Sequence, residues 1–390
     1  MKPWFTTLDR KTSDSAKWQI AKNQTERDDV LTFSVADSDY ETAPIIKEAL
    51  KERVAHGAFG YAMVDDNYRD AVTSWCQKRY ELSIDPTWVS PAPKVLNALS
   101  VIIDVFTNEG DGVLIQTPVY HVFEPVIKQN RRRVIDHELA YKNGRYSIDY
   151  ERLDADLNNA SMVILCSPHN PVGRVWTKPE LSRVVQLCQK HKVLLVSDEI
   201  HADLIMPGHR FVSCGAFFNE YEGIILVSAP SKTFNVAGLQ IAHTIIKHTP
   251  TRRKLAAAYQ RLHLSGPNAL AMAALKAAYT GGDAWVDAQN KHIVENYQTL
   301  KARWESFADD AYIAPLEGTY LAWLDVRFTG INGTAFVEAL KQRHGVVLSE
   351  GAAFGSQASR FVRLNLACSQ AQLKEGLRRI AAFVDETLRR

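Results

Sequence analysis

The sequence predicts an α/β protein with a large domain, built on a mostly parallel but mixed sheet flanked by helices, and a smaller α+β domain. Short apolar runs alternate with amphipathic helical stretches until about Tyr279, which is the pattern of strands joined by helical crossovers. Beyond that point the strands and helices are separated from one another along the chain. The chain of 390 residues is also longer than a domain with a single hydrophobic core normally is, so two domains are expected.

The strands expected in the large domain are apolar along their whole length, which is typical of strands buried on both faces. They lie at 113–116, 162–166, 193–196, 224–227 and 242–246. Residues 178–191 form the clearest helix between them, because Leu181, Val184, Val185 and Cys188 fall on one stripe. This order of strand, helix and strand predicts that most of the sheet is parallel.

The C-terminal part has fewer strands and longer helices. The expected elements are a helix at 283–307, a strand at 320–326, a helix at 334–343, a strand at 361–366 and a helix at 370–389. The first 40 residues have weak periodicity, so we expect an arm rather than a core element. The expected divisions of the chain are an N-terminal arm that joins the small domain at 1–45, the large domain at 46–282 and the small domain at 283–390.

Composition excludes several classes of protein. Lys and Arg number 46 and Asp and Glu number 44, giving a net charge of +2, whereas nucleic-acid binders normally carry a clustered basic excess. The one basic run, residues 128–133, is expected to be solvated surface. No apolar run approaches the roughly 18 residues of a membrane span, and no basic-then-apolar leader opens the chain. The five cysteines form no C-x-x-C pair, so we expect a cytoplasmic protein without disulfides or a metal site.

Polar side chains follow the expected strands at their carboxyl ends, the edge at which open α/β sheets bind ligands. They are Tyr120, Asn170, Asp198, His201, Ser231 and Lys232. Each has an ordinary structural role when taken alone, since a strand-end Asp often caps a helix and an Asn between prolines satisfies a turn. Together they match the requirements of pyridoxal 5′-phosphate, which needs an amine for its aldehyde and a carboxylate for its ring nitrogen. It also needs an amide donor for its ring oxygen and an aromatic ring on its face.

Further motifs in a characteristic order cover nearly the whole chain. They are Val-Ala-Asp-Ser-Asp-Tyr at 35–40, Gly-Ala-Phe-Gly-Tyr at 57–61, Thr-Pro-Val-Tyr at 117–120, Ser-Pro-His-Asn-Pro-Val-Gly at 167–173, Ser-Asp-Glu-Ile-His at 197–201, Pro-Ser-Lys-Thr-Phe-Asn-Val-Ala-Gly-Leu at 230–239, Gly-Thr-Tyr-Leu-Ala-Trp-Leu-Asp at 318–325 and Phe-Val-Arg-Leu-Asn at 361–365. With them the chain resembles fold-type I pyridoxal-phosphate enzymes. Within that group it resembles the cystathionine and cysteine-S-conjugate β-lyases related to class I and II aminotransferases, the MalY/PatB group.

The resemblance implies a role for each matching residue around the cofactor ring. Lys232 is the Schiff-base lysine and the catalytic acid and base. Asp198 pairs with the pyridine nitrogen, and Asn170 forms a hydrogen bond with the ring oxygen. Tyr120 stacks on the ring and borders the substrate, while His201 stands where many aminotransferases carry a tyrosine that also donates to that oxygen.

Other matching residues belong to the substrate and to a second chain. Arg363 resembles the arginine that binds the substrate α-carboxylate through two hydrogen bonds, which suits a planar guanidinium. Asp37 is also expected at the substrate. Tyr61 matches a tyrosine that reaches the cofactor phosphate of the neighbouring subunit, which implies a homodimer with shared active sites. Its hydroxyl is a second candidate catalytic group.

The phosphate pocket is expected where a helix begins near residue 95, because free backbone N–H groups at a helix N-terminus bind anions. The expected donors are the N–H groups of Val95 and Leu96, with Ser231 nearby. Two positions depart from the family pattern, since Lys94 replaces a common glycine and Gln240 replaces the phosphate-binding arginine of many aminotransferases. The sequence leaves open whether Lys94 points outward or adds charge to the phosphate.

The resemblance favours α,β-elimination from L-cystathionine or another cysteine S-conjugate, with pyruvate, ammonia and a thiol as products. Transamination of an L-amino acid is a second interpretation, because it uses the same lysine and aspartate. A third is a protein that keeps the cofactor as a structural or sensing ligand. No glycine-rich dinucleotide fingerprint opens a βαβ unit, and the 12 histidines form no H-x-x-x-H pair, so neither a nicotinamide cofactor nor a metal is expected.

Overall fold

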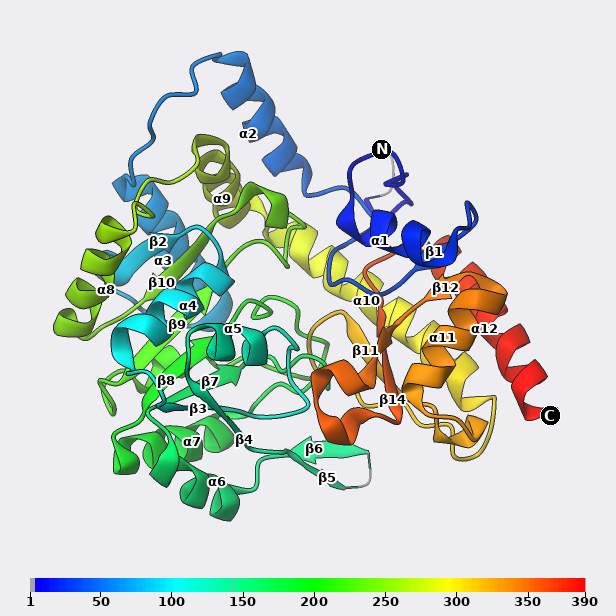
Figure 1. The fold of residues 1–390 in the computed structure, drawn as a ribbon. Helices are drawn as coiled ribbons and strands as arrows, with labels where there is room; N and C mark the ends of the chain where they lie inside the picture. Colours follow the sequence, from blue (N-terminus) through cyan, green and yellow to red (C-terminus); the bar gives the residue numbers. More distant parts are fainter. Residues whose placement is uncertain (1–3, 143, 390) are drawn as a thin grey trace.

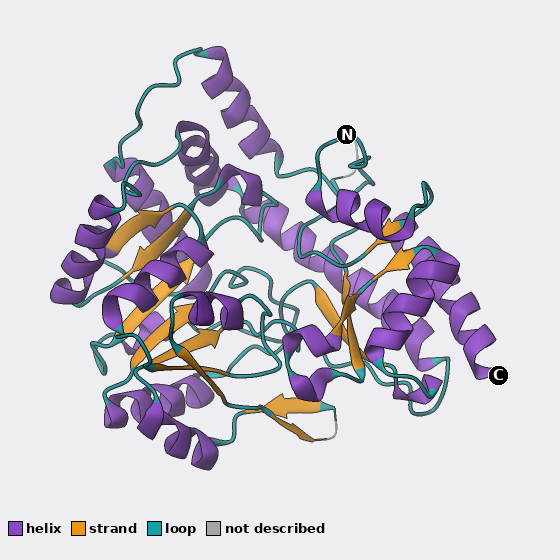
Figure 2. Cartoon of the chain, in the orientation of Figure 1, coloured by secondary structure: helices purple, strands orange, loops and turns teal. Residues whose placement is uncertain are grey.

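The computed structural model, which describes residues 4–142 and 144–389, is built around a seven-stranded sheet with the order β2-β10-β9-β8-β7-β3-β4 (Figures 1 and 2). The strands are β2 (Val89–Ala92), β3 (Gly112–Ile115), β4 (Arg133–Asp136), β7 (Met162–Cys166), β8 (Leu194–Asp198), β9 (Ile224–Ser228) and β10 (Ala242–Ile245). Strands β4, β3, β7, β8 and β9 are parallel, whereas β10 is antiparallel to both β9 and β2. The predicted mixed, mostly parallel sheet is therefore confirmed.

Helices cover both faces of this sheet, which explains why its central strands are apolar throughout. In β7, Ile164 belongs to a core shared with α4 (Val95–Phe106), whereas Val163 and Leu165 belong to a second core shared with α7 (Lys178–His191). Alternate side chains of a strand point to opposite faces, so each face needs its own apolar set. Burial on both faces thus accounts for the continuous apolar runs in the sequence.

Helix α7 has the predicted bounds because its ends are specified locally. Thr177 and Glu180 form a capping box, in which each side chain accepts a hydrogen bond from the backbone N–H of the other residue. At the other end Lys192 adopts a left-handed conformation with φ 56°, and its backbone N–H bonds to carbonyls of the last turn. Such signals lie within a few residues of the helix and can be read without the tertiary structure.

The remaining helices of the larger part pack on this sheet or on one another. They are α2 (Pro44–Ala55), α3 (Asp66–Tyr80), α5 (Phe123–Gln129), α6 (Tyr150–Asp156), α8 (Thr249–Arg261) and α9 (Ala269–Gly281). Helix α2 projects away from the sheet and packs against α9 (Figure 1). A short hairpin of β5 (Ala140–Lys142) and β6 (Arg145–Ser147) extends from the sheet edge toward the C-terminal part (Figure 1). No helix in the described part of the chain combines the length and the hydropathy that crossing a membrane requires.

The C-terminal part follows the predicted order of elements. It contains α10 (Asp283–Glu305), β11 (Leu321–Asp325), α11 (Gly333–His344), β12 (Val346–Val347), β13 (Ser349–Glu350), β14 (Phe361–Asn365) and α12 (Gln370–Leu388). Strands β11, β14 and β13 form a small antiparallel sheet. The sequence did not reveal β12 and β13, because two-residue strands have no measurable periodicity. The expected domain limits at 45 and 282 stay predictions.

The first 40 residues are more than the expected arm. They form α1 (Ala16–Thr25) and β1 (Leu31–Thr32), and β1 pairs in parallel with β12. Phe33 and Tyr40 are fully buried in the main core. The prediction that this stretch holds no core element is therefore wrong. Its contacts come from residues about 300 positions later in the chain, which local periodicity cannot reveal.

The basic run at 128–133 is solvated except at one position. Lys128 and Arg131 are exposed and form surface ion pairs. Arg132 is buried instead, and its guanidinium donates to the backbone carbonyl and the hydroxyl of Thr107. The expectation of a wholly solvated run is thus wrong for Arg132, which closes the end of α4 by satisfying carbonyl groups that the helix leaves free.

Candidate active site

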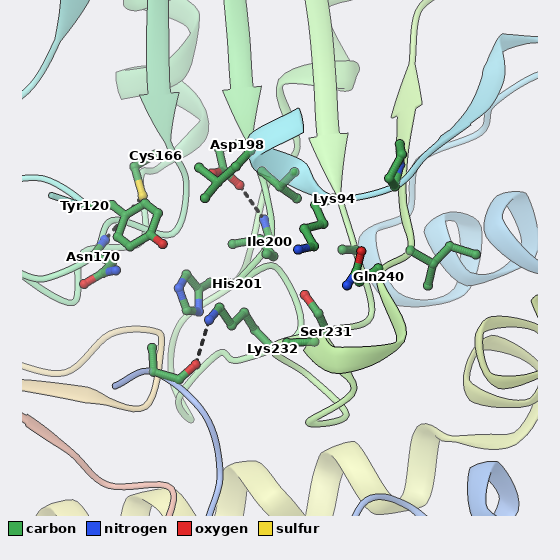
Figure 3. Close-up of a pocket in the computed structure, with 17 residues that line it drawn as sticks. Lys94, Tyr120, Cys166, Asn170, Asp198, Ile200, His201, Ser231, Lys232 and Gln240 are labelled. Carbon is green, nitrogen blue, oxygen red and sulfur yellow. Dashed lines mark hydrogen bonds between the residues drawn. The ribbon is translucent and has the colours of Figure 1, made fainter. Parts of the chain in front are cut away.

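A cavity opens at the carboxyl ends of β7, β8 and β9 (Figure 3). The cavity is lined by these predicted site residues: Val95, Leu96, Tyr120, Asn170, Asp198, His201, Ser231 and Lys232. Lys94 and Gln240 also line it. Parallel strands end at the same edge of a sheet, so the loops that follow them converge on one place. The structure thus brings together most of the residues that the sequence singled out.

Lys232 reaches into the cavity from the loop that follows β9. Its Nζ donates a hydrogen bond to the backbone carbonyl of Ala36, at 2.6 Å. Burial lowers the pKa of the Lys232 ammonium to about 8, with Asp37 and Asp198 acting to raise it and Arg363 to lower it. Near neutral pH this amine is therefore uncharged more often than an exposed lysine, and the uncharged form is the one that can attack an aldehyde or accept a proton.

Asp198 is the last residue of β8 and is almost fully buried. Burial raises the pKa of its carboxyl group to about 7, while the Ile200 N–H at 3.1 Å and the Lys232 charge act to lower it. Among the described residues none forms an ion pair with this carboxylate. A protonated ring nitrogen at this position would supply the missing positive charge, and the carboxylate would in turn keep that nitrogen protonated.

His201 and Tyr120 border the same space (Figure 3). His201 is buried edge-on to the ring of Tyr320, and its Nδ1 is a buried atom without a partner in the described structure. Burial lowers the pKa of His201 to about 3, and the nearby charges of Lys232 and Arg363 act in the same direction. The imidazole is therefore neutral, so it can offer one N–H donor to a ligand oxygen without adding charge.

Arg363 lies on β14, next to the cavity rather than in its lining. Its guanidinium donates to Oδ1 of Asn170 at 3.0 Å, to the Ser34 carbonyl at 2.8 Å and to Ser349 Oγ at 3.3 Å. Burial lowers the pKa of this guanidinium to about 10. It has no carboxylate partner in the described part of the chain, and its Nε is unsatisfied. A buried cation without an anion is costly unless a ligand supplies one, so this is a position for a carboxylate.

The bond to Arg363 also decides how the Asn170 side chain is oriented. A guanidinium can only donate hydrogen bonds, so the atom of Asn170 that faces Arg363 has to be the carbonyl oxygen. The NH₂ group of Asn170 is then left as a donor for whatever occupies the cavity. This orientation is the one that a ring phenolate oxygen requires.

Besides Arg363, two predicted residues lie outside the cavity lining of a single chain. Asp37 follows Ala36, which is in the lining, and its carboxylate forms an ion pair with Arg10 at 2.9 Å. Tyr61 is fully exposed on the irregular segment between α2 and α3. Sequence reasoning gave no role to Ala36, because it acts through its backbone carbonyl and a motif match says nothing about main-chain acceptors.

The orphaned buried groups fit pyridoxal phosphate. Among the described residues Asp198 has no ion-pair partner, Arg363 has no carboxylate partner, and neither the Asn170 NH₂ group nor Nδ1 of His201 has a hydrogen-bond partner. Lys232 supplies a partly neutral amine. These groups surround one cavity at the carboxyl edge of a mostly parallel sheet. Fold and site together define the class of fold-type I pyridoxal-phosphate proteins.

Comparison with known proteins places the chain within that class. It belongs to the class I and II aminotransferase family, whose model matches residues 28–380. It is 37% identical to the cystathionine β-lyase PatB of Bacillus subtilis, over 95% of this chain and 96% of that protein. It is 32% identical to protein MalY of Escherichia coli, over 95% of each chain. These relatives confirm the predicted MalY/PatB relationship.

A solved structure agrees with the same assignment. The pyridoxal-phosphate-bound C–S lyase of Staphylococcus hominis, solved with the inhibitor L-cycloserine, superposes with a TM-score of 0.93. It is 26% identical and covers 98% of both chains. The architecture described above is therefore shared along the whole length of the protein.

Proposed function

We propose that the protein is a pyridoxal-phosphate-dependent carbon–sulfur lyase that cleaves L-cystathionine and related cysteine S-conjugates by α,β-elimination. The observation that carries the proposal is the cavity in which Lys232 and Asp198 lie beside the Arg363 guanidinium, which has no carboxylate partner among the described residues. These groups suit an aldehyde cofactor and the carboxylate of an amino acid. The choice of elimination is supported by relatives named cystathionine β-lyase.

When bound, the cofactor supplies an aldehyde that takes up an amine and a protonated ring that withdraws electrons from the substrate Cα. The carboxylate of Asp198 holds the proton on the ring nitrogen. The NH₂ group of Asn170 and the neutral imidazole of His201 donate to the ring oxygen, and Tyr120 covers the ring face. These residues keep the ring oriented and electron-poor.

Arg363 and Lys232 act on the substrate itself. The Arg363 guanidinium binds the α-carboxylate, which directs the Cα–H bond toward Nζ of Lys232. The neutral amine accepts the Cα proton, the Cβ–S bond breaks, and its electron pair leaves with sulfur. A proton from the Lys232 ammonium then converts the thiolate to a thiol, and water hydrolyses the remaining fragment to pyruvate and ammonia.

The test is to incubate purified protein, loaded with pyridoxal phosphate, with L-cystathionine in the absence of a keto acid. Pyruvate, ammonia and homocysteine formed in equal amounts would support elimination. Turnover that depends on an added keto acid would overturn it in favour of transamination. That second function has some support, because more distant relatives are named as transaminases at 25–26% identity.

Replacing Arg363 with lysine is expected to lower kcat/KM for L-cystathionine by roughly 10- to 100-fold, mostly through KM. A lysine ammonium cannot form the planar pair of hydrogen bonds with a carboxylate, and one charged hydrogen bond contributes about 1.5–3 kcal/mol. Steady-state assays of pyruvate release measure this. Arg360→Lys is the matched control, because Arg360 directly precedes β14 but its guanidinium lies over the ring of Tyr141. This variant should leave KM within about twofold.

We also propose a cytoplasmic homodimer with shared active sites. Tyr61, Phe59 and Met63 are exposed large side chains on one short segment, and such clusters are typical of surfaces that another protein covers. All five cysteines are buried and unpaired, which suits a reducing compartment. In this proposal the Tyr61 hydroxyl of one chain binds the cofactor phosphate in the other.

Replacing Tyr61 with phenylalanine is then expected to weaken cofactor binding by roughly tenfold, since it removes one hydrogen bond to a charged group. Spectroscopic titration of the apoprotein with pyridoxal phosphate measures the Kd, and light scattering checks that the dimer persists. An elimination rate and a Kd equal to those of the wild type would remove Tyr61 from the site.

A further inference from the structure

The side of the cavity away from Asn170 and Tyr120 is formed by the start of α4 and by the loop after β9. Lys94, Ser231 and Gln240 lie together there (Figure 3). The first backbone hydrogen bond within α4 runs from the Ala98 N–H to the Lys94 carbonyl, at 3.0 Å. The preceding N–H groups of the helix therefore have no carbonyl partner within it and are available to an anion.

Charge is scarce on this side of the cavity. A phosphate monoester carries about two negative charges, whereas a helix N-terminus offers roughly half a positive charge. Within the described lining, Lys94 and Lys232 are the cationic side chains, and Lys232 is bonded to the Ala36 carbonyl. Ser231 and Gln240 are neutral. Lys94 is therefore the side chain that can bring a full positive charge to a phosphate at this position.

The conformation of Lys94 suits that task. It is the N-cap residue of α4, with φ −150° and ψ 158°, and its side chain does not cap the helix. It forms no hydrogen bond or ion pair with another residue that the structure describes. Lys94 is exposed to solvent, and its ammonium points toward the cavity that the residue lines (Figure 3). A lysine that has no partner among the described residues and stands at the free N–H end of a helix is arranged as a point-charge phosphate ligand.

We propose that Lys94 binds the cofactor phosphate and supplies the positive charge that Gln240, as a neutral amide, cannot. The inference rests on the proposed pyridoxal-phosphate function and adds to it the source of phosphate charge in this chain. Lys94 acts through the phosphate alone, so it contributes to cofactor affinity and has no contact with the reacting carbon. The affinity for a cofactor without the phosphate should therefore not depend on the Lys94 side chain.

The experiment compares pyridoxal phosphate with pyridoxal, which has the same aldehyde and ring but no phosphate. Apoprotein of the wild type and of Lys94→Met is titrated with each, and the visible absorbance of the bound compound gives the Kd. Lys94→Met is expected to weaken pyridoxal phosphate binding about tenfold or more and to leave pyridoxal binding within about twofold. Lys128→Met, an exposed lysine paired with Glu124 on α5, is the control and should change neither Kd.

A second variant keeps the proposal falsifiable if Lys94→Met is perturbed in some other way. In the double variant Lys94→Met with Gln240→Arg, the positive charge comes from the loop after β9 instead of from the start of α4. This variant is expected to regain most of the affinity for pyridoxal phosphate. Equal losses for both compounds, an unchanged Kd for pyridoxal phosphate, or no restoration by the arginine would each overturn the proposal. Failure of the proposed function is distinct, since wild-type protein would then bind neither compound and borohydride would trap no adduct at Lys232.

Discussion

Replacing Lys232 with alanine is expected to reduce the rate of cystathionine cleavage by roughly 10⁴-fold or more. The neutral amine is the proton acceptor of the proposed reaction, and a positioned general base alone contributes about 10²–10⁴ in rate. Its second task, reaction with the cofactor aldehyde, is lost at the same time. The alanine variant should also lose the visible absorbance of cofactor held by that amine, and borohydride treatment should leave no adduct at position 232.

Lys232→Arg is the companion variant, because it keeps a long cationic side chain that can still donate to the Ala36 carbonyl. A guanidinium remains protonated at neutral pH, so it can serve neither as base nor as nucleophile. We expect Lys232→Arg to fold like the wild type, by circular dichroism and thermal unfolding, and to be as inactive as Lys232→Ala. Substantial pyruvate release by either variant would contradict the assignment of Lys232.

Replacing Asp39 with asparagine is expected to lower the free energy of unfolding by about 3 kcal/mol, because it removes the nearer carboxylate partner of buried Lys17 and leaves only Asp37, at 3.7 Å. The carboxylate is fully buried and lies 2.7 Å from Nζ of Lys17, whose side chain is 1% exposed. It also accepts hydrogen bonds from Trp18 Nε1 and Gln372 Nε2, both at 2.9 Å. One side chain thus joins α1, the segment before α2, and α12.

Chemical unfolding monitored by tryptophan fluorescence measures the loss. Asp66→Asn is the control, since Asp66 is 96% exposed in its pair with Arg69 and exposed pairs contribute about 0–1 kcal/mol. Lys17→Met combined with Asp39→Asn should recover part of the stability, because no unpaired charge is then buried. If Asp39→Asn unfolds at the same denaturant concentration as the wild type, the buried pair does not hold the N-terminal segment.

This segment connects stability with the active site. Asp39 lies three residues after Ala36, whose carbonyl accepts hydrogen bonds from both Lys232 and the Tyr320 hydroxyl. The buried ion pair between Lys17 and Asp39 therefore holds in place the stretch of chain that carries the Ala36 carbonyl. We therefore expect Asp39→Asn to weaken cofactor binding as well as the fold, whereas the surface control should affect neither.

The sequence by itself determined the parallel sheet and the residues at its edge. Apolar runs separated by capped helices leave few other topologies, and parallel strands necessarily end at a common edge. Asp198 ends β8 and Lys232 follows β9, its neighbour in the sheet, so their proximity follows from strand order. For the same reason the bounds of α7 could be predicted from signals inside the segment.

Only the tertiary structure decided which distant groups complete the site. The bond from Arg363 to Asn170 joins residues 193 positions apart, and that from Lys232 to the Ala36 carbonyl spans 196. The direction of Lys94, which the sequence left open, is likewise set by how α4 meets the loop after β9. These contacts arise when separate parts of the chain pack together, and no local pattern records them because their partners share neither a helix nor a strand.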